Sequence, residues 1–109
     1  MVPNVLVVEP YADLRDGIVA VLDRLDFVCD AVENAEQAAL RLHEHDYAYV
    51  LVDIDDDSAA PLADLVTSLD AHANVILITD CDPRDIRSRD RAVLRKPFAR
   101  EELVAQFAH

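Results

Sequence analysis

The chain has 109 residues, 52% of them hydrophobic and 29% charged, which suits one domain over residues 1–109 with one buried core and argues against disorder. Its net charge of −12 opposes binding to nucleic acid over a broad surface, because the phosphates would repel the protein. Only two cysteines, no signal peptide and no apolar run of the ~18 residues that span a membrane predict a reducing, cytoplasmic location away from the membrane.

Basic residues are concentrated near the end of the chain. The stretch 84–100 holds seven of the ten basic residues and only two acidic ones, so it carries a charge of +5 and the remainder carries −17. One interpretation is a solvated, ion-paired surface. The other is a docking patch for an effector domain or another acidic protein partner.

Strand and helix patterns alternate from the start of the chain. Residues 4–8 form an unbroken aliphatic run, typical of a strand buried on both faces. From Asp13 to Leu25, apolar residues recur at helical spacing and share one face. Gly17, the only glycine, falls inside this helix, where it costs up to about 1 kcal/mol relative to alanine. We therefore expect close packing of a neighbouring element against Gly17.

The middle of the chain repeats the alternation. Residues 27–32 predict a short strand, and a capping-box signature at Asn34 opens a helix with a narrow, alanine-rich apolar stripe. Residues 49–52 predict a third strand that ends at Asp53. Pro61 suits the first turn of a further helix.

The last third of the chain is less regular. Residues 74–78 form the strongest strand pattern, 92–94 a weak fifth strand, and 99–107 a closing helix that buries Leu103, Val104 and Phe107. Between these last two strands Ile86 is the only aliphatic side chain, so a fourth helix there would be shortened or missing. Strands that alternate with helices predict an α/β fold, a parallel sheet with helices on both faces.

Polar side chains stand where the predicted strands end. They are Glu9 after the first strand, Asp53 and Asp55–Asp57 after the third, Thr79 after the fourth, and Lys96 with Pro97 after the fifth. The carboxyl ends of parallel strands meet at one edge, so we expect these groups to converge there. A carboxylate can become an acyl phosphate, oxygen ligands can hold the divalent cation it needs, and a lysine and a hydroxyl can contact phosphoryl oxygens. Pro97 favours extended geometry at Lys96, which helps aim its side chain across the edge.

Four segments resemble the landmarks of the receiver domains of bacterial two-component response regulators, in the same order: VLVVEPYADLR, YVLVDID, VILIT and LRKPF. The resemblance implies a flavodoxin-like, doubly wound parallel sheet in the order 2-1-3-4-5. It implies a signalling protein in a phosphorelay, not an enzyme, whose phosphoryl donor is a histidine kinase or a phosphotransfer protein. The implied roles are phosphoacceptor for Asp53, Mg²⁺ binding in an acidic pocket for Glu9, Asp53 and the backbone carbonyl of Asp55, switch hydroxyl for Thr79 and phosphate contact for Lys96.

Departures from the family pattern bear on this function. Pro10 stands where receivers have a second acidic residue that binds the metal directly, so an oxygen ligand is lost and Mg²⁺ binding would be weakened. Val93 replaces the aromatic residue expected three positions before Lys96. The run Asp55–Asp57 is either a solvated loop or a substitute for the missing oxygen.

Two other functions compete. Pro10, Val93 and the eroded fourth helix fit a receiver-like interaction module that works without phosphorylation, through a partner or as a homodimer. The spacing of Asp53 and Asp55 also resembles that of haloacid-dehalogenase-type phosphatases, but no acidic pair follows Lys96 and no cap domain is present to exclude water. The histidines at 43 and 45 do not share a helical face, so no zinc site is predicted.

Overall fold

The computed structural model describes residues 3–55, 73–82 and 92–107. Its elements, in chain order, are β1 (Val5–Val8), α1 (Ala12–Arg24), β2 (Cys29–Val32), α2 (Ala35–Glu44), β3 (Tyr49–Asp53), β4 (Asn74–Thr79), β5 (Ala92–Arg95) and α4 (Arg100–Ala105). The helix expected from Pro61, the shortened fourth helix and residues 84–91 of the basic stretch lie outside the described residues.

The five strands form one parallel sheet in the order β2-β1-β3-β4-β5, which confirms the predicted flavodoxin-like topology. The register aligns Asp53 with Ile78 and Thr79 with Arg95, so β3, β4 and β5 end almost level. The backbone pairing continues past the strands, because the Ile54 N–H donates to the Ile78 carbonyl at 2.9 Å and the Lys96 N–H to the Thr79 carbonyl at 2.7 Å. The residues that follow these strands are thereby held side by side.

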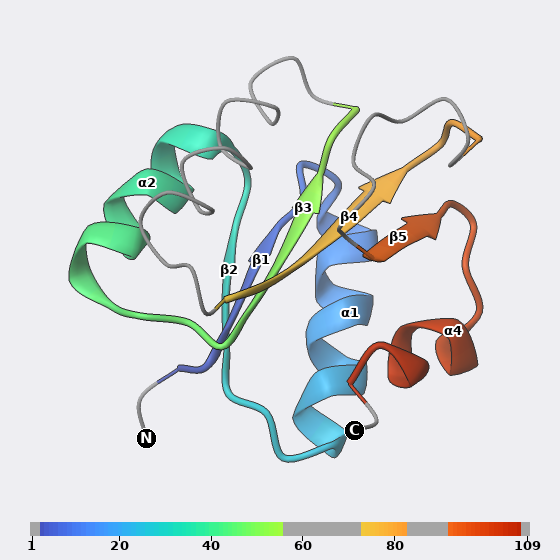
Figure 1. The fold of residues 1–109 in the computed structure, drawn as a ribbon, viewed down its shortest axis with the longest axis horizontal. Coiled ribbons are helices and arrows are strands. Elements are labelled where there is room, and N and C mark those ends of the chain that lie inside the picture. The colour runs from blue at the N-terminus through green and yellow to red at the C-terminus, as the bar shows by residue number, and fades with distance from the viewer. Residues whose placement is uncertain (1–2, 56–72, 83–91, 108–109) are drawn as a thin grey trace.

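Helices cover both faces of the sheet, with α2 on one face and α1 and α4 on the other (Figure 1). Alternate residues of each strand point to opposite faces, so Leu6 and Val8 join the core beneath α2 while Val5 and Val7 join the core beneath α1 and α4. Burying each such side chain contributes about 1.5–3 kcal/mol. Two stacked cores therefore fix the orientation of the strands and of the edge where they end.

The amphipathic pattern of α1 is confirmed, but the expectation for Gly17 is wrong. Ile18 and Leu22 are buried, and Leu14, Val21 and Leu25 pack against the same core. Gly17 is exposed, and a Cβ built on it would meet nothing within 4 Å. No close approach requires a glycine here, because its position falls on the solvent side of the helix.

The predicted strand over residues 27–32 begins later than expected, at Cys29. Asp26 adopts a positive φ of 67° and turns the chain, and the Phe27 ring packs with the rings of Tyr49 and Phe107 instead of entering the sheet. Cys29 is half-buried and packs against the core beneath α1, as a small filler would.

The closing helix α4 is shorter than the 99–107 prediction. The carboxylate of Glu102 accepts a hydrogen bond from the Ala99 N–H at 3.2 Å, which satisfies a free donor at the start of the helix. Leu103 and Phe107 are buried as predicted, and Val104 is half-buried. Among the described residues, none of the helices has the length and apolarity to cross a bilayer.

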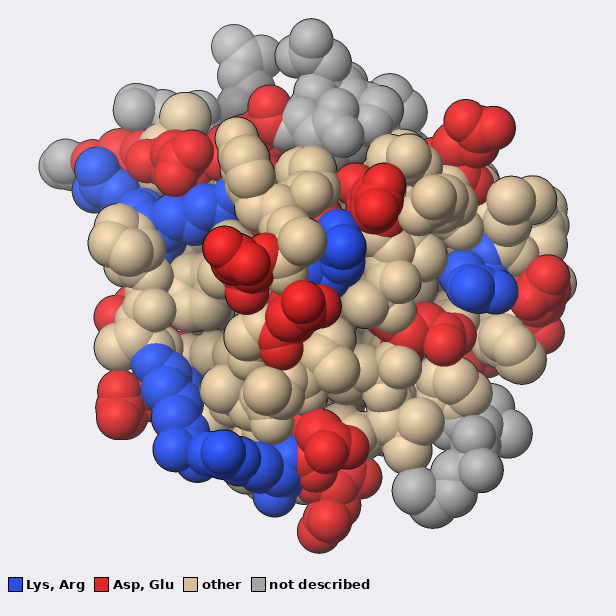
Figure 2. Space-filling view, turned by 180° about the vertical axis from the view of Figure 1, so that it is seen from behind, with Lys and Arg blue, Asp and Glu red and all other residues tan. Residues whose placement is uncertain are grey.

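Basic and acidic side chains lie interspersed on the face shown in Figure 2. Of the basic stretch 84–100, the described residues Arg95 and Arg100 are exposed, whereas Lys96 is largely covered. Lys96 therefore belongs to the pocket described next and not to the solvated surface.

Candidate functional site

Asp53 is the last residue of the central strand β3 and is buried, with 2% of its surface exposed. One carboxylate oxygen, Oδ1, accepts a hydrogen bond from the Asp55 N–H at 2.8 Å. The other, Oδ2, accepts from the Lys96 ammonium at 2.6 Å. Asp53 is thus a buried carboxylate with a hydrogen-bond donor on each oxygen.

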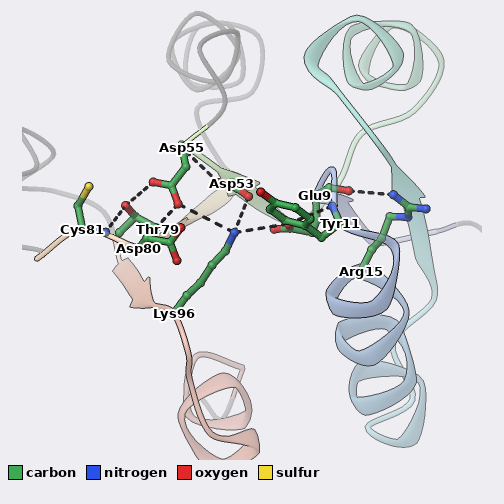
Figure 3. A network of polar contacts seen from close by, with 9 residues as sticks. All are labelled: Glu9, Tyr11, Arg15, Asp53, Asp55, Thr79, Asp80, Cys81 and Lys96. Carbon is green, nitrogen blue, oxygen red and sulfur yellow. Dashed lines mark hydrogen bonds and ion pairs between the residues drawn. The ribbon is translucent and has the colours of Figure 1, made fainter.

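The Lys96 side chain reaches back across the end of the sheet to this carboxylate (Figure 3). Its Nζ also lies 3.5 Å from Glu9 Oε1 and 4.0 Å from Asp55 Oδ2. Burial works to lower the pKa of Lys96, but the hydrogen bond to Asp53 and the charges of Asp53 and Glu9 outweigh it and raise the pKa. Lys96 is therefore a lasting positive charge among three carboxyl groups.

Glu9 follows β1 directly and is completely buried. Oε1 accepts from the Tyr11 N–H at 3.3 Å, whereas Oε2 has no hydrogen-bond donor. Burial, the charge of Asp53 and a hydrogen bond that protonated Glu9 shares with Asp53 raise the pKa of Glu9 to about 7, against the opposing pull of Lys96 and the Tyr11 N–H. The orphaned Oε2 marks a place where the pocket has an unused acceptor.

Thr79 and Asp55 face each other across the ends of β4 and β3. The buried Thr79 hydroxyl donates to Asp55 Oδ1 at 2.7 Å and accepts from the Cys81 N–H at 3.0 Å. The Asp80 N–H donates to Asp55 Oδ2 at 2.8 Å. The sequence left the Asp55 side chain either in a solvated loop or as a substitute for the missing metal oxygen, and the structure places its carboxylate in this hydrogen-bond network.

The sequence reasoning missed two further residues, both near the start of α1. The ring of Tyr11, 66% exposed, lies with its centroid 5.3 Å from the Lys96 ammonium. Arg15 donates to the Glu9 backbone carbonyl at 3.0 Å and lies 3.9 Å from the Glu33 carboxylate. Both residues follow Glu9 closely, by two and six positions, and lie at the start of α1 on this same edge of the sheet. That closeness in sequence was the signal that could have identified them.

The remaining predicted residues, Pro10 and Pro97, are exposed. Pro10 brings no side-chain oxygen to the pocket, and the Lys96–Pro97 peptide bond is cis. Pro97 thus stands beside Lys96, while the ammonium is oriented by the carboxyl groups that surround it.

Carboxylate and carbonyl oxygens are the ligand type that Mg²⁺ takes in proteins. Among the described side chains, no group of three or more His, Cys, Asp or Glu is arranged to hold a metal ion. Mg²⁺, however, is usually bound through one or two carboxylates with water and a phosphate supplying the rest. The residues that could hold such an ion are Glu9, whose Oε2 has no hydrogen-bond donor, Asp53 and the backbone carbonyl of Asp55.

A comparison with protein-family models finds no match, and no curated protein matches the chain. Solved structures do match. A two-component response regulator from Clostridium difficile superposes with a TM-score of 0.86 at 18% identity over 97% of this chain and 93% of its own. TrrA from Thermotoga maritima, solved in complex with Mg²⁺ and BeF, gives 0.84 at 22% identity over 97% and 96%.

NtrX from Brucella abortus, solved in complex with ADP, gives a TM-score of 0.84 at 21% identity. That match covers 98% of this chain but only 25% of the NtrX chain, so the shared part is a module of a longer protein there. Because these sequence identities are only 18–22%, the comparisons show a shared fold and not a shared function. The chain has the fold of the receiver domains of response regulators.

Proposed function

We propose that this protein is a cytoplasmic receiver, a single domain over residues 1–109, that accepts a phosphoryl group on Asp53 from a histidine kinase or phosphotransfer protein. The observation that carries the proposal is the buried pair of Asp53 and Lys96, 2.6 Å apart at the carboxyl end of the sheet. Glu9 lies 3.5 Å from the Lys96 ammonium and Thr79 ends the neighbouring strand, which adds a second carboxyl group and a hydroxyl of the kinds that phosphoryl transfer uses.

In the proposed reaction a carboxylate oxygen of Asp53 attacks the phosphorus of the donor's phosphohistidine. The new oxygen–phosphorus bond forms as the phosphorus–nitrogen bond breaks, and its electron pair stays on the imidazole, which takes up a proton. Lys96, already charged and 2.6 Å from Asp53, offsets the negative charge of the phosphoryl oxygens. The Thr79 hydroxyl and the Asp80 N–H lie at the neighbouring strand end and can donate to the same oxygens.

Glu9, Asp53 and the backbone carbonyl of Asp55 would hold Mg²⁺, which when bound neutralises part of the charge on the phosphoryl group. Pro10 leaves this set one oxygen short, so the proposed affinity for Mg²⁺ is low. Glu9 is kept in place by the Tyr11 N–H and, through its backbone carbonyl, by Arg15.

The competing candidate is a receiver-like module that binds partners without phosphorylation. It is favoured by Pro10, and by the half-buried Val93, which is too small to act as an aromatic switch. Its partner, or a second copy of the chain, would dock on the basic residues of the 84–100 stretch, of which the described Arg95 and Arg100 are exposed.

The test is incubation with acetyl phosphate or with beryllofluoride at high Mg²⁺, followed by intact mass spectrometry or fluorine NMR. We expect an adduct in the wild type, none in Asp53→Asn, and an unchanged adduct in Asp46→Asn, which alters an exposed acid ahead of β3. Pro10→Asp restores the missing oxygen and should form the adduct at about tenfold less Mg²⁺. If wild type and Pro10→Asp both remain unmodified, the phosphoacceptor proposal is wrong and the binding module is preferred.

A further inference from the structure

The carboxylate of Asp55 accepts two hydrogen bonds from the end of β4 and lies near the ammonium that follows β5. Oδ1 accepts from the Thr79 hydroxyl at 2.7 Å, and Oδ2 accepts from the Asp80 N–H at 2.8 Å. The Lys96 ammonium lies 4.0 Å from Oδ2. A hydroxyl, a backbone amide and an ammonium around two oxygens form a small anion-binding site, and a side chain of the protein fills it (Figure 3).

These donors stand next to Asp53, the proposed phosphoacceptor. The Asp55 N–H donates to Asp53 Oδ1 at 2.8 Å, and Lys96 binds Asp53 Oδ2. A phosphoryl group on Asp53 would place further negatively charged oxygens beside Lys96 and next to the strand end that carries the Thr79 hydroxyl and the Asp80 N–H. The Thr79 hydroxyl and the Asp80 N–H each have a single hydrogen to donate, so they cannot serve both anions, and the two negative charges repel each other.

We propose that the Asp55 carboxylate is an internal substitute for the phosphoryl group, bound to the anion site while Asp53 is unmodified. This rests on the proposed function and adds its regulation: phosphorylation must first displace Asp55. The Thr79 hydroxyl is then engaged both before and after phosphoryl transfer, and only its acceptor changes. The protein resists phosphorylation and holds Thr79 in the bound arrangement without it.

The partial exposure of Asp55 is consistent with displacement. Its side chain is 27% exposed, whereas the side chain of Asp53 is 1% exposed. The Asp55 carboxylate can therefore leave the site toward water at modest cost, because solvation replaces the hydrogen bonds it gives up. The Thr79 hydroxyl left behind is buried and the Lys96 side chain is 11% exposed, so a new anion can supply the acceptor that they lose.

The first experiment examines the contact without any phosphoryl chemistry. Asp55→Ala should shift the amide proton of Asp80 upfield in nitrogen–proton NMR spectra, and Asp46→Ala, which removes an exposed acid, should leave it in place. In a double-mutant cycle, Asp55→Ala and Thr79→Val should destabilise the fold by less together than the sum of their separate effects. An unmoved Asp80 amide with additive effects overturns the proposal.

The second experiment titrates beryllofluoride at saturating Mg²⁺. Asp55→Ala and Asp55→Asn should bind it about tenfold more tightly than the wild type, because a charged competitor for the donors is gone. Asp46→Ala should match the wild type. Equal or weaker binding by both Asp55 variants overturns the competition.

The two proposals fail in different ways. If no chain binds beryllofluoride or forms an acyl phosphate, the proposed function is wrong, and the occupancy of the anion site by Asp55 is decided by the Asp80 amide and the double-mutant cycle. If the wild type and the variants form the adduct equally well, the proposed function stands and the internal substitute does not.

Discussion

The two halves of the pocket differ in how completely their polar groups are paired. On the β3–β4 side, both oxygens of Asp53 and both of Asp55 accept hydrogen bonds. On the β1 side, the completely buried Glu9 has an oxygen without a donor. The difference teaches that one side is satisfied by the protein itself, while the other is left for a cation or a proton to complete.

The largest effect is expected from Lys96→Met, which removes the one ammonium that contacts both sides. Glu9 and Asp53 would then be buried without their common positive partner, and we expect the free energy of unfolding at pH 8, without Mg²⁺, to fall by about 3 kcal/mol. Urea denaturation measures this. Arg24→Met, an exposed position near the end of α1, is the control and should change stability little. A loss no greater than that of the control would mean that the pair is not coupled to folding.

Glu9→Gln tests the β1 side alone, because it removes the buried carboxyl group that has an oxygen without a donor. The pKa of Glu9 is raised from 4.5 to about 7, so the folded protein binds more protons than the unfolded chain between these values, and its stability falls as the pH rises through that window. Glutamine carries no such penalty. In EDTA we expect Glu9→Gln to be more stable than the wild type by roughly 2 kcal/mol at pH 8, with the gain vanishing near pH 4.5.

Mg²⁺ sharpens the same comparison, because it should stabilise the wild type but not Glu9→Gln. Thermal melts at pH 8 with and without Mg²⁺ measure the stabilisation of the wild type and of Glu9→Gln. A variant that is less stable than the wild type at pH 8 in EDTA would show that the Lys96 contact to Glu9 outweighs the cost of burying the acid.

The smallest effect lies outside the pocket. Gly17→Ala in α1 should raise the free energy of unfolding by up to about 1 kcal/mol, because alanine restricts the unfolded chain and fits the open site. The exposed Ala20→Gly in the same helix is the reciprocal control and should lower it by a similar amount. Mg²⁺ and beryllofluoride binding should be unaffected by either change.

The sequence predicted the edge of the sheet well because that edge is encoded locally. Each aliphatic run stops at the residue where its strand ends, and in a parallel sheet those ends meet, so Asp53, Thr79 and Lys96 could be expected on the same side. The order of the strands in the sheet was predicted from the resemblance to receiver domains.

What the sequence did not reveal depends on where side chains reach. Asp55 stands two residues beyond a strand, and no periodicity tells whether its carboxylate faces water or the neighbouring Thr79. The predicted close packing against Gly17 was wrong for a similar reason. Helical spacing does not tell which element, if any, packs against a given residue of the helix. The late start of β2 is due to the left-handed turn at Asp26, a conformation that is uncommon outside glycine.

The ring of Tyr11 beside the Lys96 ammonium gives this molecule an optical reporter of its own. The chain has no tryptophan and three tyrosines, so its ultraviolet emission comes from those three phenols. Tyr47 is buried and Tyr49 half-buried, while Tyr11 is exposed, with its ring centroid 5.3 Å from the Lys96 ammonium that would attract a bound anion. Events at the acidic pocket can therefore be followed in real time in the unlabelled protein, with Tyr11→Phe as the spectral blank.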